Sequence, residues 1–131
     1  MAIPISKIEK GEPGVTGGGE KKWYAYTKAT GEADIDQLSE LIEMISTVSD
    51  IDISGVLKSF IKVVPRELAA GRIVRLGDLG SLRISISSQG HETEDEVSAA
   101  SVTDVRIIFT PGPALKHMLH NLEFVISNSK D

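Results

Sequence analysis

The sequence has no cysteine among its 131 residues. This absence excludes disulfide bonds, thiolate nucleophiles and zinc held by cysteine. No apolar run approaches the roughly 18 residues that a membrane-spanning helix needs. The opening residues, MAIPISKIEK, lack the basic start and long apolar stretch of a secretory signal. We therefore expect a chain that works in the cytoplasm.

Recognisable catalytic patterns are also missing. No Ser, His and Asp stand in the local context of a nucleophilic triad, and no pair of carboxylates lies in an evident pocket motif. The glycine-rich stretch 11–19, GEPGVTGGG, lacks the Gly-Lys-Ser/Thr ending and the following helix of a phosphate-binding loop. These absences predict a protein that is not an enzyme and holds no cofactor.

The three histidines give no metal site. His117 and His120 are three residues apart, which suits two ligands, but no carboxylate stands at a helical neighbour to complete a set. His91 lies beside several acids, yet their spacing matches no calcium loop. We expect surface histidines and a solvated acidic loop.

Composition and charge describe a folded chain with an uneven charge distribution. A hydrophobic content of 40% and a net charge of -5 are typical of a globular domain, and the length suits one modest domain with a short appendage. Residues 88–104 contain five acids and no lysine or arginine. An acidic balance argues against a nucleic-acid partner, since such partners select basic surfaces.

The first half predicts a hairpin and two helices. Residues 3–28 read as a β-hairpin with a mobile glycine-rich tip and a first strand that is a possible edge strand. We expect Trp23 in a small core; alternatively, Lys21 and Lys22 beside the stackable rings of Trp23 and Tyr24 form a surface for phosphate contact. Apolar spacings of three and four from Leu38 to Val48 predict a helix that Asp34 begins. A second helix follows, capped by Ser54 or Asp52, kinked at Pro65 and ended by Gly71.

The second half predicts a sheet, an arm and a third helix. Strands at 73–76 and 82–86 flank a turn whose glycines allow positive φ. A polar ribbon over about 87–104 leads to a strand at 105–109, and Pro113 begins a helix. A last short strand is expected at 124–126. This order predicts an α+β fold with a three-stranded antiparallel sheet and a thin core. Because a single copy would leave apolar faces exposed, we expect a dimer.

Two motifs carry a resemblance to a known family. GRIVRLGDLGSL at 71–82 is similar to the strand–turn–strand of the HU and integration host factor family of bacterial histone-like DNA-binding proteins, and FTPGPALKHML at 109–119 resembles that family's Phe-Arg-Pro-Gly-Lys-Ala-Leu-Lys segment. The resemblance covers 34–122, with the arm at about 87–104. Residues 1–33 are then an N-terminal hairpin extension, and 123–131 a C-terminal strand and tail.

The resemblance implies an intertwined homodimer whose two β-arms embrace duplex DNA through the minor groove, reading sequence weakly. A non-enzymatic, nucleoid-associated architectural protein is therefore the first hypothesis. Only Lys116 carries over from the family motif directly. The other predicted contacts are hairpin lysines and arginines of the saddle between the arms: Lys7, Lys10, Lys21, Lys22, Lys28, Arg75, Arg83 and Arg106.

A second hypothesis keeps the fold without the DNA. Ser87 and Ser88 stand where the family usually places arginine, and the tip QGHETEDE has no proline wedge. Carboxylates repel phosphates, so the acidic arm also fits a protein-interaction or structural module that has lost DNA binding.

Overall fold

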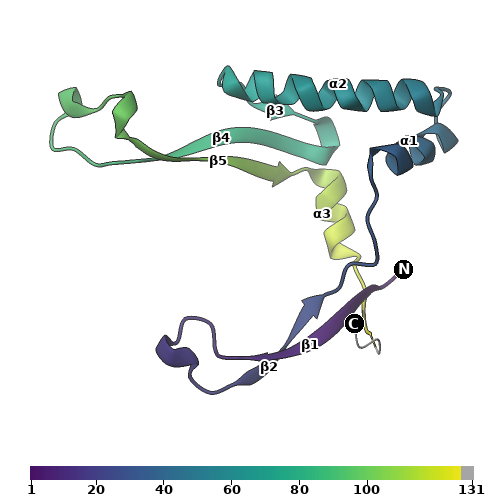
Figure 1. Cartoon of the computed structure of the whole chain (residues 1–131), viewed down its shortest axis with the longest axis horizontal. Helices are drawn as coiled ribbons and strands as arrows, with labels where there is room; N and C mark the ends of the chain where they lie inside the picture. The colour runs from purple at the N-terminus through teal and green to yellow at the C-terminus, as the bar shows by residue number, and fades with distance from the viewer. Residues whose placement is uncertain (128–131) are drawn as a thin grey trace. The chain divides into compact units, whose positions relative to one another are not determined.

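The computed structural model describes residues 1–127, which divide into two compact units. We call Met1–Asp34 with the residues from His120 onward the hairpin unit, and Ile35–Leu119 the arm unit. Their elements are drawn in Figure 1. The end of the C-terminal tail that we expected, from residue 128, lies outside the described residues.

The hairpin unit is a three-stranded sheet in the order β2-β1-β6. β1 (Ile3–Lys10) pairs antiparallel with β2 (Lys22–Thr27) and parallel with β6 (Phe124–Ile126). The hairpin and the last strand are confirmed, but the expectation of an edge position for β1 was wrong, because β6 occupies its other side. The first and the last strand of the described residues therefore lie in one sheet.

Two helices begin the arm unit, α1 (Ile35–Met44) and α2 (Asp50–Ala69). α2 begins earlier than the apolar spacing suggested. Its N-cap is Ser49, whose side chain accepts a hydrogen bond from the backbone N–H of Asp52 at 3.4 Å. The predicted caps at Ser54 and Asp52 are wrong. The helix runs through Pro65 as one continuous element.

Gly71 ends α2 as the sequence predicts. Its φ is +83°, and its N–H donates to the carbonyl of Leu68 at 3.0 Å. The N–H of Arg72 donates to the carbonyl of Glu67 at 3.1 Å. Together these bonds form the Schellman arrangement that satisfies carbonyls left unpaired at a helix end.

The arm unit's sheet is antiparallel in the order β3-β4-β5. β3 (Val74–Arg75) is shorter than expected, while β4 (Gly80–Ser88) and β5 (Val102–Pro111) form a long ribbon (Figure 1). The arm expected at about 87–104 corresponds to the outer end of this ribbon and its tip. A short 3-10 turn, Gly77–Leu79, joins β3 to β4. A Cβ at Gly80 would lie 2.4 Å from the carbonyl oxygen of Thr110, so this close approach requires glycine.

The arm tip is folded, not open. Two 3-10 turns, Glu94–Glu96 and Ala99–Ser101, lie between the ribbon strands.

After β5 comes α3 (Pro113–His120), which begins at Pro113, a position where the missing backbone N–H of proline costs nothing.

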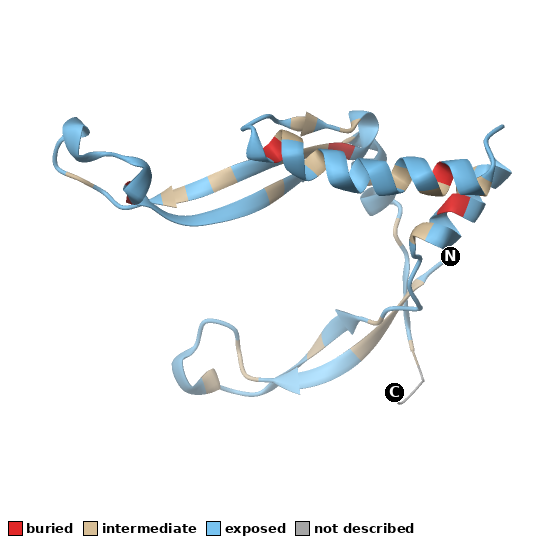
Figure 2. Cartoon of the chain, turned by 45° about the horizontal axis from the view of Figure 1, so that its top comes forward, coloured by how far each residue is buried: buried red, intermediate tan, exposed pale blue. Residues whose placement is uncertain are grey.

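The core of one copy is thin. Among residues 1–127, the only buried large apolar side chains are Ile53 and Leu68 (Figure 2). On the apolar side of the arm's ribbon, Ile86, Val105 and Ile107 are 51%, 58% and 61% exposed. A groove of about 350 Å³ between α2 and the sheet is lined almost wholly by apolar side chains, among them Val64, Leu82 and Ile107.

Candidate functional site

The pairing register sorts the arm's sheet into two chemically different faces. Leu82 lies opposite Phe109, Ile84 opposite Ile107 and Ile86 opposite Val105, which makes one face apolar. α2 and the groove beside it lie on that face, through Leu82, Ile84 and Ile107. Since side chains alternate along a strand, the residues between them project from the opposite face.

That opposite face gathers the arginines. Arg75 pairs with Ser81, which pairs with Thr110; Arg83 lies opposite Ile108, and Ser85 lies opposite Arg106. We name this surface the arginine face, defined by Arg75, Arg83 and Arg106. Each of the three arginines is exposed. The short hydroxyl residues around them, Ser81, Ser85, Ser87 and Thr110, leave the guanidinium groups room to reach a ligand.

The arginines differ in what they contact. Arg106 donates from Nη1 to Ser87 Oγ at 2.8 Å and pairs with Asp104 at 3.3 Å, toward the arm tip. Arg75 and Arg83 form no ion pair with any residue in 1–127. Two unpaired guanidinium groups and one partly neutralised group thus stand on one sheet face, where they can bind an anion with two parallel hydrogen bonds each.

Lys116 does not belong to the arginine face. It lies on α3, with its backbone N–H bonded to the carbonyl of Gly112 at 3.0 Å and its side chain exposed. It forms no ion pair within the described part of the chain.

The lysines of the hairpin unit separate onto different surfaces. Lys10 lies opposite Lys22 in the β1–β2 register, and the Lys10 ammonium lies 5.1 Å from the centre of the Tyr24 ring. Lys22 also pairs with Glu12. Lys7 projects from the other face of the sheet, two positions before Glu9.

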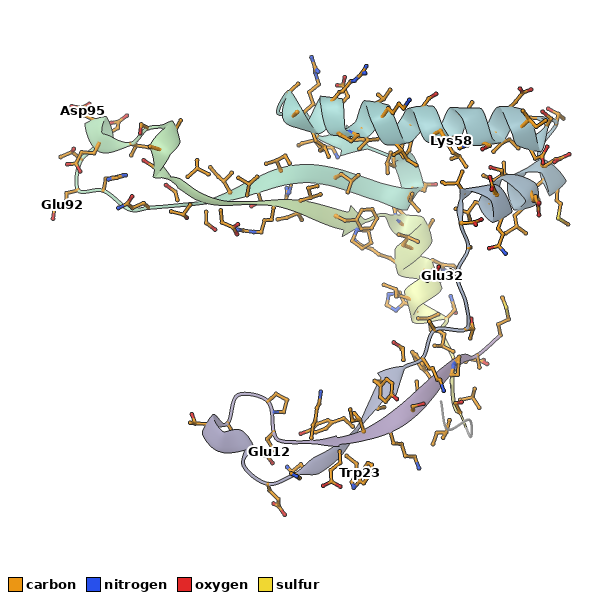
Figure 3. The ribbon with its side chains drawn as sticks, in the orientation of Figure 1. Glu12, Trp23, Glu32, Lys58, Glu92 and Asp95 are labelled. Carbon is orange, nitrogen blue, oxygen red and sulfur yellow. The ribbon has the colours of Figure 1, made fainter. Side chains whose placement is uncertain are left out.

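The remaining hairpin lysines flank β2. Lys21 precedes the strand, and Lys28 follows it with its backbone N–H bonded to the carbonyl of Pro4 at 3.0 Å. The neighbouring Trp23 is 67% exposed, so its expected burial in a small core was wrong (Figure 3).

A polar network in the arm tip was missed from the sequence. His91 Nε2 lies 2.8 Å from Oγ of Ser101, which is only 3% exposed, and His91 Nδ1 lies 3.6 Å from Glu96. The Ser98 backbone N–H donates to the same Ser101 oxygen at 3.0 Å. The spacing of polar residues in a loop does not predict which of them form hydrogen bonds with one another. The Ser-x-x-Ser spacing that begins at Ser98, typical of a capping box, was the one available signal in the sequence.

The network holds the acidic residues at the far end of the arm. Figure 3 shows Glu92 and Asp95 projecting from the tip, away from the base of the ribbon. Within residues 1–127, no group of three histidine or acidic side chains is arranged to hold a metal ion. Over the same residues, no helix is both long and apolar enough to cross a membrane.

Three comparisons with known proteins add to this geometry. A family model, HU-HIG, described as an HU domain fused to a wHTH, Ig or glycine-rich motif, matches residues 1–125. The search of curated proteins finds no match. A similar crystal structure is that of a protein from Bacteroides vulgatus ATCC 8482, provisionally named a bacterial DNA binding protein.

That structure is similar in fold, with a TM-score of 0.63 at 13% sequence identity over 99% of this chain. The chain spans about half the length of that protein, 51%. At this identity the likeness shows the fold.

Proposed function

The chain belongs to the HU-HIG family of HU domains fused to other motifs, and from this premise we propose that it is a non-enzymatic DNA-binding protein. The proposal extends to an architectural, histone-like role in the bacterial nucleoid. The partner is duplex DNA, bound through its phosphates with little reading of sequence.

The observation that carries the proposal is the arginine face. Arg75, Arg83 and Arg106 share one side of the sheet, with Ile108 the one large apolar residue among them, while the pairs Leu82–Phe109, Ile84–Ile107 and Ile86–Val105 share the other. The strands contribute one acid to this face, Asp104 of β5, which lies toward the arm tip and pairs with Arg106. A sheet with one cationic, hydroxyl-lined face suits the backbone of a duplex, because the duplex presents closely spaced phosphates on its surface. Binding these phosphates requires no deep pocket.

We propose that the protein acts as a homodimer. A monomer of 14.1 kDa buries enough surface to leave roughly 6,700 Å² accessible, whereas one copy exposes 10737 Å². The apolar face of the ribbon and the groove beside α2 are the surfaces that most need a cover. A twofold partner that fills the groove places both arginine faces on one assembly.

The acidic arm tip limits how the arms contribute. Its carboxylates repel phosphate, so we propose that contact is made at the arginine face and base of the ribbon and that the duplex is bent little. If duplex DNA does not bind, the same tip favours the alternative of an interaction module for a basic protein.

A charge reversal separates these alternatives. Arg83→Glu removes an unpaired arginine from the arginine face, and we expect at least about tenfold weaker binding of mixed-sequence duplex DNA, measured by fluorescence anisotropy. The matched control is Lys62→Glu, the same change of charge at an exposed position of α2. Equal losses in the two variants would mean that net charge alone governs binding, and the arginine face would then not be the interface.

A further inference from the structure

The hairpin unit has a second basic surface, on a different sheet from the arginine face. In the β1–β2 register, Ile8 lies opposite Tyr24, Ser6 opposite Tyr26 and Lys10 opposite Lys22. Directly opposed residues project from the same side of a sheet, so one face holds two tyrosines and two lysines. We name it the tyrosine face, defined by Lys10, Lys22, Tyr24 and Tyr26.

The other side of the same sheet is different. It carries Ile5, Thr27, Ala25 and Phe124, which together with part of Tyr26 line an apolar groove of about 310 Å³, and the oppositely charged Lys7 and Glu9. The strands contribute no carboxylate to the tyrosine face. Within residues 1–127, the acid that pairs with this face is Glu12, which follows β1 and contacts Lys22.

We propose that the tyrosine face binds an unpaired DNA strand by stacking bases on its rings. This inference rests on the proposed DNA-binding function and adds a second surface, with a different form of the ligand. Every base has an aromatic face, so stacking on tyrosine needs no particular sequence, and neighbouring lysines neutralise the backbone.

The spacing of the rings selects an unpaired strand over a duplex. Tyr24 and Tyr26 are two residues apart on β2, which sets them about 6.8 Å apart along the strand. Bases stacked in a duplex strand repeat every ~3.4 Å and hide their faces against one another. Only a strand whose bases have separated can present successive faces at the spacing of the two rings.

The exposure of the rings and the lysines fits this use. Tyr26 is 45% exposed, so a base can reach its ring. The ammonium of Lys10 lies over Tyr24, where it can meet the phosphate between two stacked bases or move aside for a base. Lys22, directly opposite, offers a second cation once its partner Glu12 is displaced.

The test measures binding of a labelled oligothymidylate to the full chain by fluorescence anisotropy at low salt. Tyr26→Ala is expected to weaken binding about tenfold, while Tyr26→Phe keeps the ring and retains the affinity. Lys10→Glu is expected to weaken binding, whereas Lys7→Glu, on the opposite face of the same strand, has little effect. Glu12→Gln frees Lys22 and is expected to tighten binding severalfold.

The outcomes distinguish this inference from the proposed function. Binding of duplex DNA without binding of the oligothymidylate overturns the inference and leaves the arginine face standing. Equal losses for Tyr26→Ala and Tyr26→Phe, or for Lys10→Glu and Lys7→Glu, also overturn it. Failure of both ligands to bind at low salt overturns both proposals. Retained duplex affinity of Tyr26→Ala shows that the variant is folded.

Discussion

At the scale of single residues, function in this chain depends on which side chains the register sets on one face. Arg75, Arg83 and Arg106 are far apart in sequence, and each has an acid near it along the chain. Only the pairing of β3, β4 and β5 shows that they share a surface and that Arg106 alone has an acidic partner there.

The residue-scale prediction concerns the arm tip. His91→Ala removes the imidazole that contacts Ser101, and leaves a buried hydroxyl with one partner fewer. We expect the tip to open more easily, by about 1 kcal/mol, with little change in the stability of the rest of the chain.

Hydrogen exchange checks this prediction at the backbone N–H of Gln89, which donates to the carbonyl of Ser101 at 2.8 Å. The control is Glu92→Gln, in an exposed tip residue outside the network. Unchanged protection of that amide in His91→Ala would mean that the network does not hold the tip.

At the scale of elements, sequence periodicity predicted which helices and strands form, but not which strands pair with one another. The three helices, the ribbon strands, the hairpin and the αL cap at Gly71 follow from apolar spacing and glycine chemistry. The parallel pairing of β1 with β6 did not, because β6 is only three residues long and its partner lies at the other end of the chain. Local patterns contain no information on such a partner.

The start of α2 was also not predicted correctly from local sequence patterns. Apolar spacing pointed to a helix capped by Ser54 or Asp52, but Ser49 caps it, and the first turn carries Asp50 and Asp52 beside the buried Ile53. Ser49→Ala is expected to destabilise the protein by about 1 kcal/mol in urea unfolding, since the backbone N–H of Asp52 loses its side-chain acceptor. Ser54→Ala serves as the control, and an equal or larger loss there would restore the original assignment.

At the scale of the whole molecule, a single copy leaves the apolar face of the β4–β5 ribbon exposed to water. Ile107 is 61% exposed and lines the groove beside α2. In the proposed homodimer this side chain is covered. We therefore expect Ile107→Asp to shift the protein from a dimeric mass toward monomer or unfolded chain, measured by light scattering at micromolar concentration.

Thr110→Asp adds the same charge to the other face of β5 and is expected to leave the mass unchanged. A monomeric mass for the unaltered protein would contradict the proposed assembly itself. The candidate sites and the assembly are linked, because a dimer doubles the arginines that face one duplex.

In the proposed function, this HU-family chain binds duplex DNA through its arginine face. The most direct measurement is the affinity for a mixed-sequence duplex over a series of salt concentrations. Six arginines, three from each protomer, predict that log K falls against log salt with a slope of about −5. No binding at low salt, or an affinity that salt leaves unchanged, would contradict the claim.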